Sequence, residues 1–432
     1  MSQVNKDYFN EKTLQELIHQ HNEVDWLQTS RFAALRDFDE RPWPAATDEA
    51  WRRTNISNID FNSYELVNGV QKNRDLELID TSEDLSGFIR FHGAHVTEAR
   101  LSNELFEKGV IFMGLADAAR RFPKLVQEYF NEKKDTVADA KFKSFNRSFW
   151  THGVFLYVPS FLELSQPFKV VFEESGNKIA SLPQILIVLK SGARVNFRQE
   201  IVGTDSEEIL RNALVHLHVE DAAYLNYVEI QNLNDKSYNF SFGDAFVGRD
   251  AEINTLVAVF GSKLTKHYIG SNLTGRGANA KIQGIYFAEN RQHLDFQTLQ
   301  NHQAGSAKSD LLYKGVVKDR AHAVYQGLIK VYPDAQLTDA YQTNRNLLLN
   351  DKARADSIPS LEIEANDVKC SHGSTVGKIN AEEIFYLMSR GLSEHDARKM
   401  VVDGFFEDLL KDAPEDVRDQ LRKQIESELE AI

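Results

Sequence analysis

Short hydrophobic runs with alternating polar positions dominate the middle of the chain, between residues 151 and 363. These runs are rich in Val, Ile, Phe and Tyr, and Gly, Asn or Asp separates each run from the next. Alternation with a period of two is typical of β-strands whose two faces meet different surroundings. No helical pattern of useful length interrupts this region, so we expect a β-rich core.

The runs also recur at a regular spacing. The clearest copies begin at Ala193, Ala223, Ala251, Ala278 and Ala307, and weaker copies begin at Leu264, His293, Ala321 and Ala335. The full period is therefore near 28 residues, and the weaker copies divide it into halves near 14. Two strands in each turn predict a flattened parallel β-helix. A β-sandwich is the alternative, although its strands usually recur every 8 to 12 residues or so.

The first part of the chain mixes helical and strand patterns. Apolar residues from Leu14 to Leu35 follow helical spacing until a Pro-Trp-Pro segment ends the pattern. Further along, the run 110–113 predicts a strand and residues 116–130 predict an amphipathic helix. We therefore interpret residues 1–150 as an N-terminal α/β cap domain and residues 151–372 as the β-helix core.

The chain becomes helical again after Ile379, and we interpret residues 373–432 as a C-terminal helical domain. Asn380 and Ser393 are suitable N-caps for two of its helices. The second of these helices has an apolar side made of Ala397, Met400, Val401 and Phe405. The last helix carries a stripe of four apolar residues at a spacing of four: Val417, Leu421, Ile425 and Leu429. The stripe predicts a helix that packs on its own neighbours or one that also meets a partner protein.

Charge and composition exclude several classes of function. The formal net charge of −14 disfavours nucleic acid as a partner, because an acidic protein repels phosphate backbones. No apolar run approaches the roughly 18 residues that a membrane-spanning helix needs, and residues 1–10 contain no secretion signal. We therefore expect a cytoplasmic protein. Cys370 is the single cysteine, which excludes an internal disulfide and a site of several thiolates within one chain.

One short stretch carries candidate chemistry. Phosphate loops, nucleophile elbows and zinc-protease helices are absent from the sequence, so we do not expect an enzyme with a familiar catalytic motif. Cys370 and His372 lie two residues apart, and on a strand this spacing places both side chains on one face. A thiolate and an imidazole could bind one soft metal ion or cluster. The alternative is that neither residue binds a metal: Cys370 is then a small buried hydrophobic residue, and His372 is a hydrogen-bonded turn residue.

Several long strings of residues resemble the SufB/SufD family of the bacterial SUF system, which assembles iron–sulfur clusters. The strings are TDAYQTNRNLLL at 338–349, LEIEANDVKCSHG at 361–373 and FYLMSRG at 385–391, with weaker matches at 42–44 and 49–54. The single cysteine and the Lys-Cys-Ser-His-Gly motif resemble the SufD branch. The resemblance implies a mainly β fold, in which a right-handed parallel β-helix lies between the two terminal domains.

The resemblance also implies a function and a site. A SufD-like chain is a non-enzymatic scaffold that pairs with SufB and with two copies of the ATPase SufC. Cys370 and His372 would then lie at the SufB–SufD interface and help to hold iron or the nascent cluster, and the C-terminal helices would bind SufC.

Residue chemistry limits what the chain could do alone. A cluster takes about four protein ligands, so two residues predict a transient cluster shared with SufB and none bound tightly to the isolated chain. The sequence leaves open whether the isolated chain forms a homodimer. The sequence also leaves an alternative function open, that of a β-helix polysaccharide lyase or hydrolase.

Overall fold

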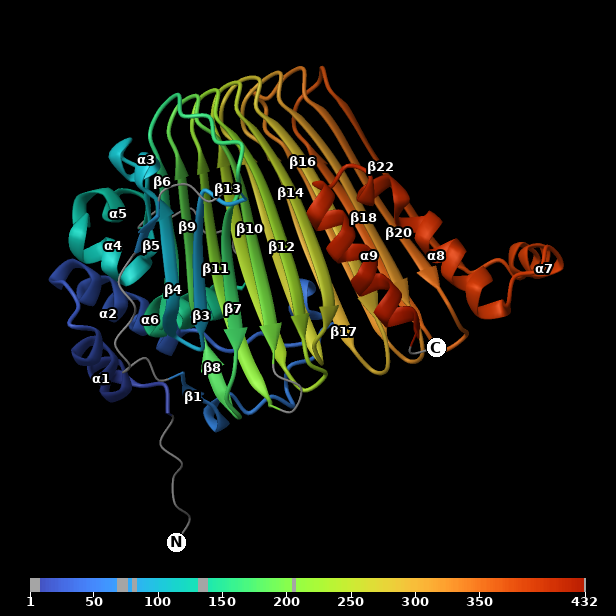
Figure 1. Cartoon of the computed structure of the whole chain (residues 1–432), viewed down its shortest axis with the longest axis horizontal. Coiled ribbons are helices and arrows are strands. Elements are labelled where there is room, and N and C mark those ends of the chain that lie inside the picture. Colours follow the sequence, from blue (N-terminus) through green and yellow to red (C-terminus); the bar gives the residue numbers. More distant parts are fainter. Residues whose placement is uncertain (1–7, 68–76, 80–83, 131–138, 204–206, 431–432) are drawn as a thin grey trace, which may run out of the picture.

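Two long parallel sheets stacked face to face make up most of the molecule (Figure 1). This computed structural model describes residues 8–67, 77–79, 84–130, 139–203 and 207–430. The described strands form two sheets of eleven strands each. From residue 183 onward successive strands alternate between the sheets, and the whole makes a parallel β-helix of about eight turns. The predicted β-helix is confirmed. The β-sandwich alternative is wrong, because within each sheet the successive strands of the solenoid pair in parallel, one turn apart.

Each of the two sheets contributes eight strands to the solenoid. Sheet A contains β6 (His152–Val158), β9 (Pro183–Leu189), β11 (Ile209–Val219), β13 (Tyr238–Val247), β15 (Leu264–Leu273), β17 (His293–His302), β19 (His322–Val331) and β21 (Arg354–Ile363). Sheet B contains β7 (Phe168–Glu174), β10 (Arg194–Gly203), β12 (Tyr224–Leu233), β14 (Glu252–Gly261), β16 (Asn279–Ala288), β18 (Lys308–Val317), β20 (Asp339–Leu348) and β22 (Lys369–Lys378). Two short strands, β1 (Glu65–Leu66) and β8 (Ile179–Ser181), pair with each other and belong to sheet A through the pairing of β8 with β11.

The alanine series marks the corners that precede the strands of sheet B. Ala223, Ala251, Ala278 and Ala307 are each buried one residue before a strand. The prediction that the next copy begins at Ala335 is wrong. The connection at 332–338 is longer than its counterparts, so β20 begins at Asp339 and Thr338 takes the corner position.

Alternate side chains of every strand fill the space between the sheets. Aromatic rings need extra room there, and glycines on neighbouring strands provide it. A Cβ atom on Gly315 would lie 1.8 Å from the ring of Tyr286, so this level of the core accepts no side chain at residue 315.

The N-terminal region places helices around the first turns of the solenoid (Figure 1). Its elements are α1 (Glu11–His21), α2 (Asp25–Glu40), η1 (Glu49–Trp51), η2 (Phe61–Ser63), β2 (Glu77–Ile79), β3 (Gly87–His92), β4 (His95–Ser102), α3 (Asn103–Glu107), β5 (Ile111–Gly114), α4 (Leu115–Arg121), α5 (Pro123–Phe130) and α6 (Ala140–Phe149). The helices within the first 40 residues and the strand near residue 110 are confirmed. The single helix expected at 116–130 is wrong, because Pro123 begins a second helix after a break at Phe122.

The sheets extend into the region that the sequence suggested as a separate cap. Strands β3 and β4 continue sheet B, and β5 continues sheet A through an antiparallel pair with β6. At the other end, β22 runs to Lys378, past the boundary suggested at residue 372.

The C-terminal helices are α7 (Ala381–Ser389), α8 (Glu394–Leu410) and α9 (Glu415–Glu430), and α7 projects beyond the last turn (Figure 1). The expected caps are present, since Asn380 Oδ1 accepts from Glu382 N at 2.9 Å and Ser393 Oγ accepts from Asp396 N at 3.0 Å. Among the described residues, no helix combines the length and apolar character needed to cross a bilayer.

The apolar stripe of α9 packs on the protein's own sheet. Val417, Leu421, Ile425 and Leu429 are buried in one cluster with residues of sheet B such as Phe260. The hypothesis that this stripe meets a partner is therefore wrong. The apolar side expected for α8 is also partly wrong, because Met400 is 53% exposed and Val402 and Phe406 are buried instead.

Candidate functional site at the end of the β-helix

The last turn of the solenoid has open strand edges. Among the described strands, β22 pairs with β20 alone and β21 pairs with β19 alone. Lys369 N donates to Thr338 O at 2.8 Å, and Ile379 N donates to Leu348 O at 2.9 Å. Since backbone groups alternate along a strand, the odd-numbered residues of β22 bond β20 and the even-numbered residues face the open edge.

Cys370 and His372 lie on the same face of β22. Cys370 pairs with Ala340 and His372 with Gln342, and both partners on β20 are buried. The Cys370–His372 pair therefore continues the inward-facing row of sheet B onto the last level. Cys370 is half-buried and packs against the small cluster around Ala340, whereas His372 is exposed.

The surroundings of Cys370 favour the protonated thiol. Burial raises its pKa, and the negative charge of Asp339 raises it further, while the backbone of Ala340 acts in the opposite direction. The thiolate is the form that binds metals. A metal ion that binds at Cys370 must therefore displace a firmly held proton.

The structure adds Gln342, which the sequence analysis missed. Gln342 is fully buried one level beneath His372, and neither polar atom of its amide has a hydrogen-bond partner within the described chain. The repeat period contains the signal, because residues 342 and 372 are 30 apart, as are 340 and 370. An unpaired buried amide is costly, so the level beneath His372 holds an unused polar group, beside Gly327 of the facing sheet.

No group of three or more His, Cys, Asp or Glu side chains within the described ranges is arranged to hold a metal ion. The Cys370–His372 pair is thus a two-ligand arrangement.

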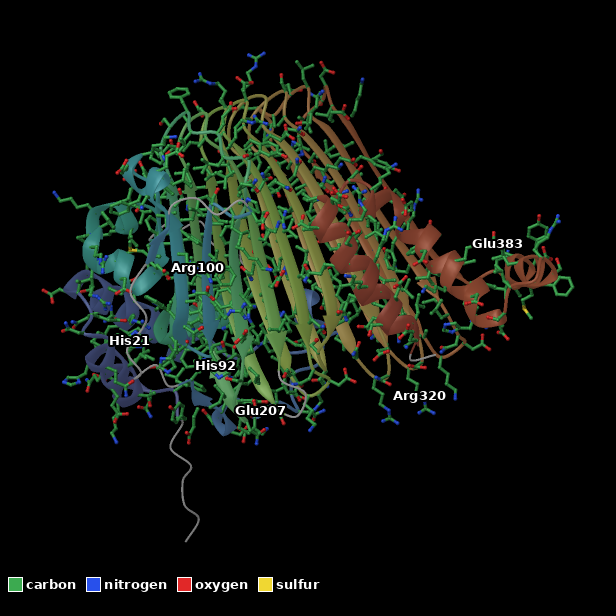
Figure 2. The ribbon with its side chains drawn as sticks, viewed as in Figure 1. His21, His92, Arg100, Glu207, Arg320 and Glu383 are labelled. Carbon is green, nitrogen blue, oxygen red and sulfur yellow. The ribbon has the colours of Figure 1, made fainter. Side chains whose placement is uncertain are left out.

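A second exposed feature lies on α7. Its apolar side chains Phe385, Tyr386 and Met388 are 73%, 57% and 42% exposed. Figure 2 shows this helix, marked by Glu383, standing clear of the solenoid. Large apolar side chains gathered on one short helix are typical of a protein-binding surface.

Comparisons with known proteins agree across the chain. Residues 171–405 match the family model of the SUF system FeS cluster assembly SufBD core domain, and residues 2–170 match that of the SufBD protein N-terminal region. The chain is 28% identical to an iron-sulfur cluster assembly SufBD family protein of Staphylococcus epidermidis, over 97% of this chain and 93% of the relative. Similar proteins of Staphylococcus saprophyticus and Staphylococcus aureus are 27% and 26% identical, with the same coverage.

Proposed function

The chain belongs to the SufB/SufD family of iron–sulfur cluster assembly proteins, and we propose that it is the SufD-type subunit of a SUF complex. In this role it is a non-enzymatic cytoplasmic scaffold that pairs with SufB and the SufC ATPase and contributes to iron acquisition and nascent cluster formation. The observation that carries the proposal is the Cys370–His372 pair on the open edge of the last β-helix turn. The family assignment replaces the alternative of a polysaccharide lyase or hydrolase.

The open end supports pairing with SufB. Backbone groups of the even-numbered residues of β22 are available to another strand, and such edges commonly accept a strand from a partner. Three apolar side chains at this end, Leu361, Ile363 and Val376, are each about two-fifths exposed. A partner strand would cover them and complete the edge. A second copy of this chain could occupy the same edge when SufB is absent.

The ligand count supports a shared cluster. Cys370 is the only thiol of the chain, and with His372 it provides two ligands of the roughly four that a cluster takes. The remaining ligands would come from SufB. Iron and the nascent cluster are therefore the cargo of the interface, and the isolated chain would hold none tightly.

The exposed face of α7 supports a contact with SufC. The stripe of α9 is covered by sheet B. Among the described residues of the C-terminal helices, the exposed large apolar side chains are Met400 on α8 and the group of three on α7, Phe385, Tyr386 and Met388. We therefore assign the SufC contact to α7.

Co-expression tests the proposed complex. The tagged full chain is produced with SufB and SufC of the same organism, and the purified material is measured by native mass spectrometry. We expect one copy of this chain, one SufB and two SufC. A complex of SufB and SufC that forms without this chain, while this chain elutes alone or as a homodimer, would overturn the proposal.

A further inference from the structure

Exposed basic side chains line the turns that lead from sheet B to sheet A. On four successive levels they are Lys263, Arg291, Arg320 and Lys352. Neighbouring strands of a sheet lie about 4.8 Å apart, so these side chains form a row along one edge of the solenoid. Figure 2 shows Arg320 projecting outward from this edge.

The row borders a groove, which we call the turn groove. One part has a volume of about 560 Å³ and is lined by Asp235, Lys263, Asn290, Arg291, Gln292, Asp319 and Arg320. A second part of about 460 Å³ shares Asp319 and is lined by Lys318, Leu349, Asn350, Glu394, His395 and Arg398. The turn groove thus runs from the middle of the solenoid to the start of α8. It includes neither the Cys370–His372 pair nor the apolar face of α7.

The acidic residues of the turn groove already have partners. Asp235 accepts hydrogen bonds from Asn290 Nδ2 at 3.0 Å and from Gln292 Nε2 at 2.6 Å. Asp319 Oδ2 accepts from the backbone N–H of Asn290 at 3.0 Å. The carboxylate of Glu394 pairs with Arg398 at 2.8 Å. Other lining residues of the turn groove therefore hold these carboxylates in place.

Arg291 and Arg320 differ from these carboxylates in having no partner among the described residues. Within the part of the chain that the structure describes, the side chains of Arg291 and Arg320 have neither a hydrogen-bond nor an ion-pair partner. Lys263 lies over the ring of Tyr238, with Nζ 5.0 Å from its centroid. A protein of net charge −14 therefore presents unpaired positive charge along this edge.

We propose that the turn groove binds an acidic peptide segment of a partner protein, with Arg291 and Arg320 each holding a carboxylate. A guanidinium matches a carboxylate with two parallel hydrogen bonds, which gives orientation as well as charge. An extended peptide presents side chains on one face roughly every 7 Å, which flexible arginines on adjacent levels can reach.

The lining favours a peptide over a polyphosphate or a nucleic acid. Asp235 and Asp319 lie among the cations and would repel an anion that carries charge on every unit, whereas a peptide can place its carboxylates between them. The lining residues also include no Phe, Tyr or Trp, so His395 at one end is the sole aromatic ring among them on which a base could stack.

Fluorescence anisotropy with the full-length protein tests this proposal. The probe is a fluorescein-labelled peptide of six Glu-Gly repeats, and a Gln-Gly peptide of equal length is its uncharged counterpart. We expect the Glu-Gly peptide to bind with an affinity that falls as salt rises. The R291E/R320E variant should bind it at least tenfold more weakly. The control for charge, R249E/R276E, makes the same change of charge at two exposed arginines on the opposite row of turns, of which Arg249 pairs with Asp221 at 2.9 Å. This variant should alter binding less than twofold.

Each other outcome would overturn the proposal. These outcomes are absence of binding, equal binding of the Gln-Gly peptide, equal loss in both double variants, or tighter binding of tripolyphosphate or oligothymidylate. A thermal melt of each variant separates loss of binding from loss of fold.

Discussion

Cys370 pairs in parallel register with Ala340, so its thiol lies directly above a buried alanine on the last level of sheet B. One side of the thiol is covered by the chain's own core, and the other side faces the open end. This partial burial is the main reason that the pKa of the Cys370 thiol is raised. A partner at this end would complete the surroundings of the thiol and decide whether it ionises.

The pH dependence of alkylation tests this environment. The thiolate reacts with iodoacetamide, so the rate rises as pH passes through the pKa of Cys370, and in the isolated protein we expect the midpoint to lie above that of free cysteine. Asp339→Asn removes a negative charge that raises this pKa. The variant should therefore react on the order of two- to fivefold faster at pH 8.

Asp367→Asn is the matched control, because Asp367 is not among the groups that shift this pKa. An alkylation midpoint at or below that of free cysteine would contradict the half-buried environment.

A pair of proline variants tests the open edge of β22. Ser374 faces the open edge, so Ser374→Pro removes a backbone donor that only a partner would use. We expect the variant to keep the melting temperature of the wild type and to bind SufB at least tenfold more weakly, or about 1.4 kcal/mol. Thr375→Pro removes a donor to β20 and should lower the melting temperature. Unchanged SufB affinity in the Ser374 variant would place the contact elsewhere.

Two variants in the C-terminal helices test stability and partner binding independently. Leu421 is fully buried against sheet B, so Leu421→Ala should lower the free energy of unfolding by about 2–5 kcal/mol. Phe385 and Tyr386 are exposed, so their double alanine variant should change stability by less than about 0.5 kcal/mol. The same variant should weaken SufC binding at least tenfold in a titration measured by calorimetry. Full SufC affinity in that variant would exclude α7 as the contact.

The sequence predicted the solenoid because its repeat obeys a local rule. Each level needs a small residue at the corner and an alternating strand, and both are visible in the letters from Ala223 to Ala307. The prediction went wrong at Ala335 because a longer connection shifts the next strand without changing its composition. The position of a strand in a regular repeat can be predicted by counting residues along the chain. A residue inserted in a turn cannot be recognised in the sequence, because it looks like any other residue of the repeat.

The sites were less predictable, since they depend on which faces other elements cover. Spacing placed Cys370 and His372 on one face of a strand, and the structure places them so. Spacing could not decide whether Leu421 or Phe385 meets solvent, because sheet B and α9 come together only in the folded chain. Gln342 was missed because its importance comes from an unpaired amide beneath His372, which is a property of packing.

The proposed cluster site is tested most directly by iron and labile sulfide measured per complex of this chain with SufB and SufC. The variants are His372→Ala, Cys370→Ser and their combination, with Ser371→Ala as a control on the opposite face of β22. We expect His372→Ala to lower cluster content without dissociating the complex, Cys370→Ser to lower it equally or less, and Ser371→Ala to leave it unchanged. Wild-type cluster content in the double variant would contradict the account and leave Cys370 and His372 as structural residues of the last turn.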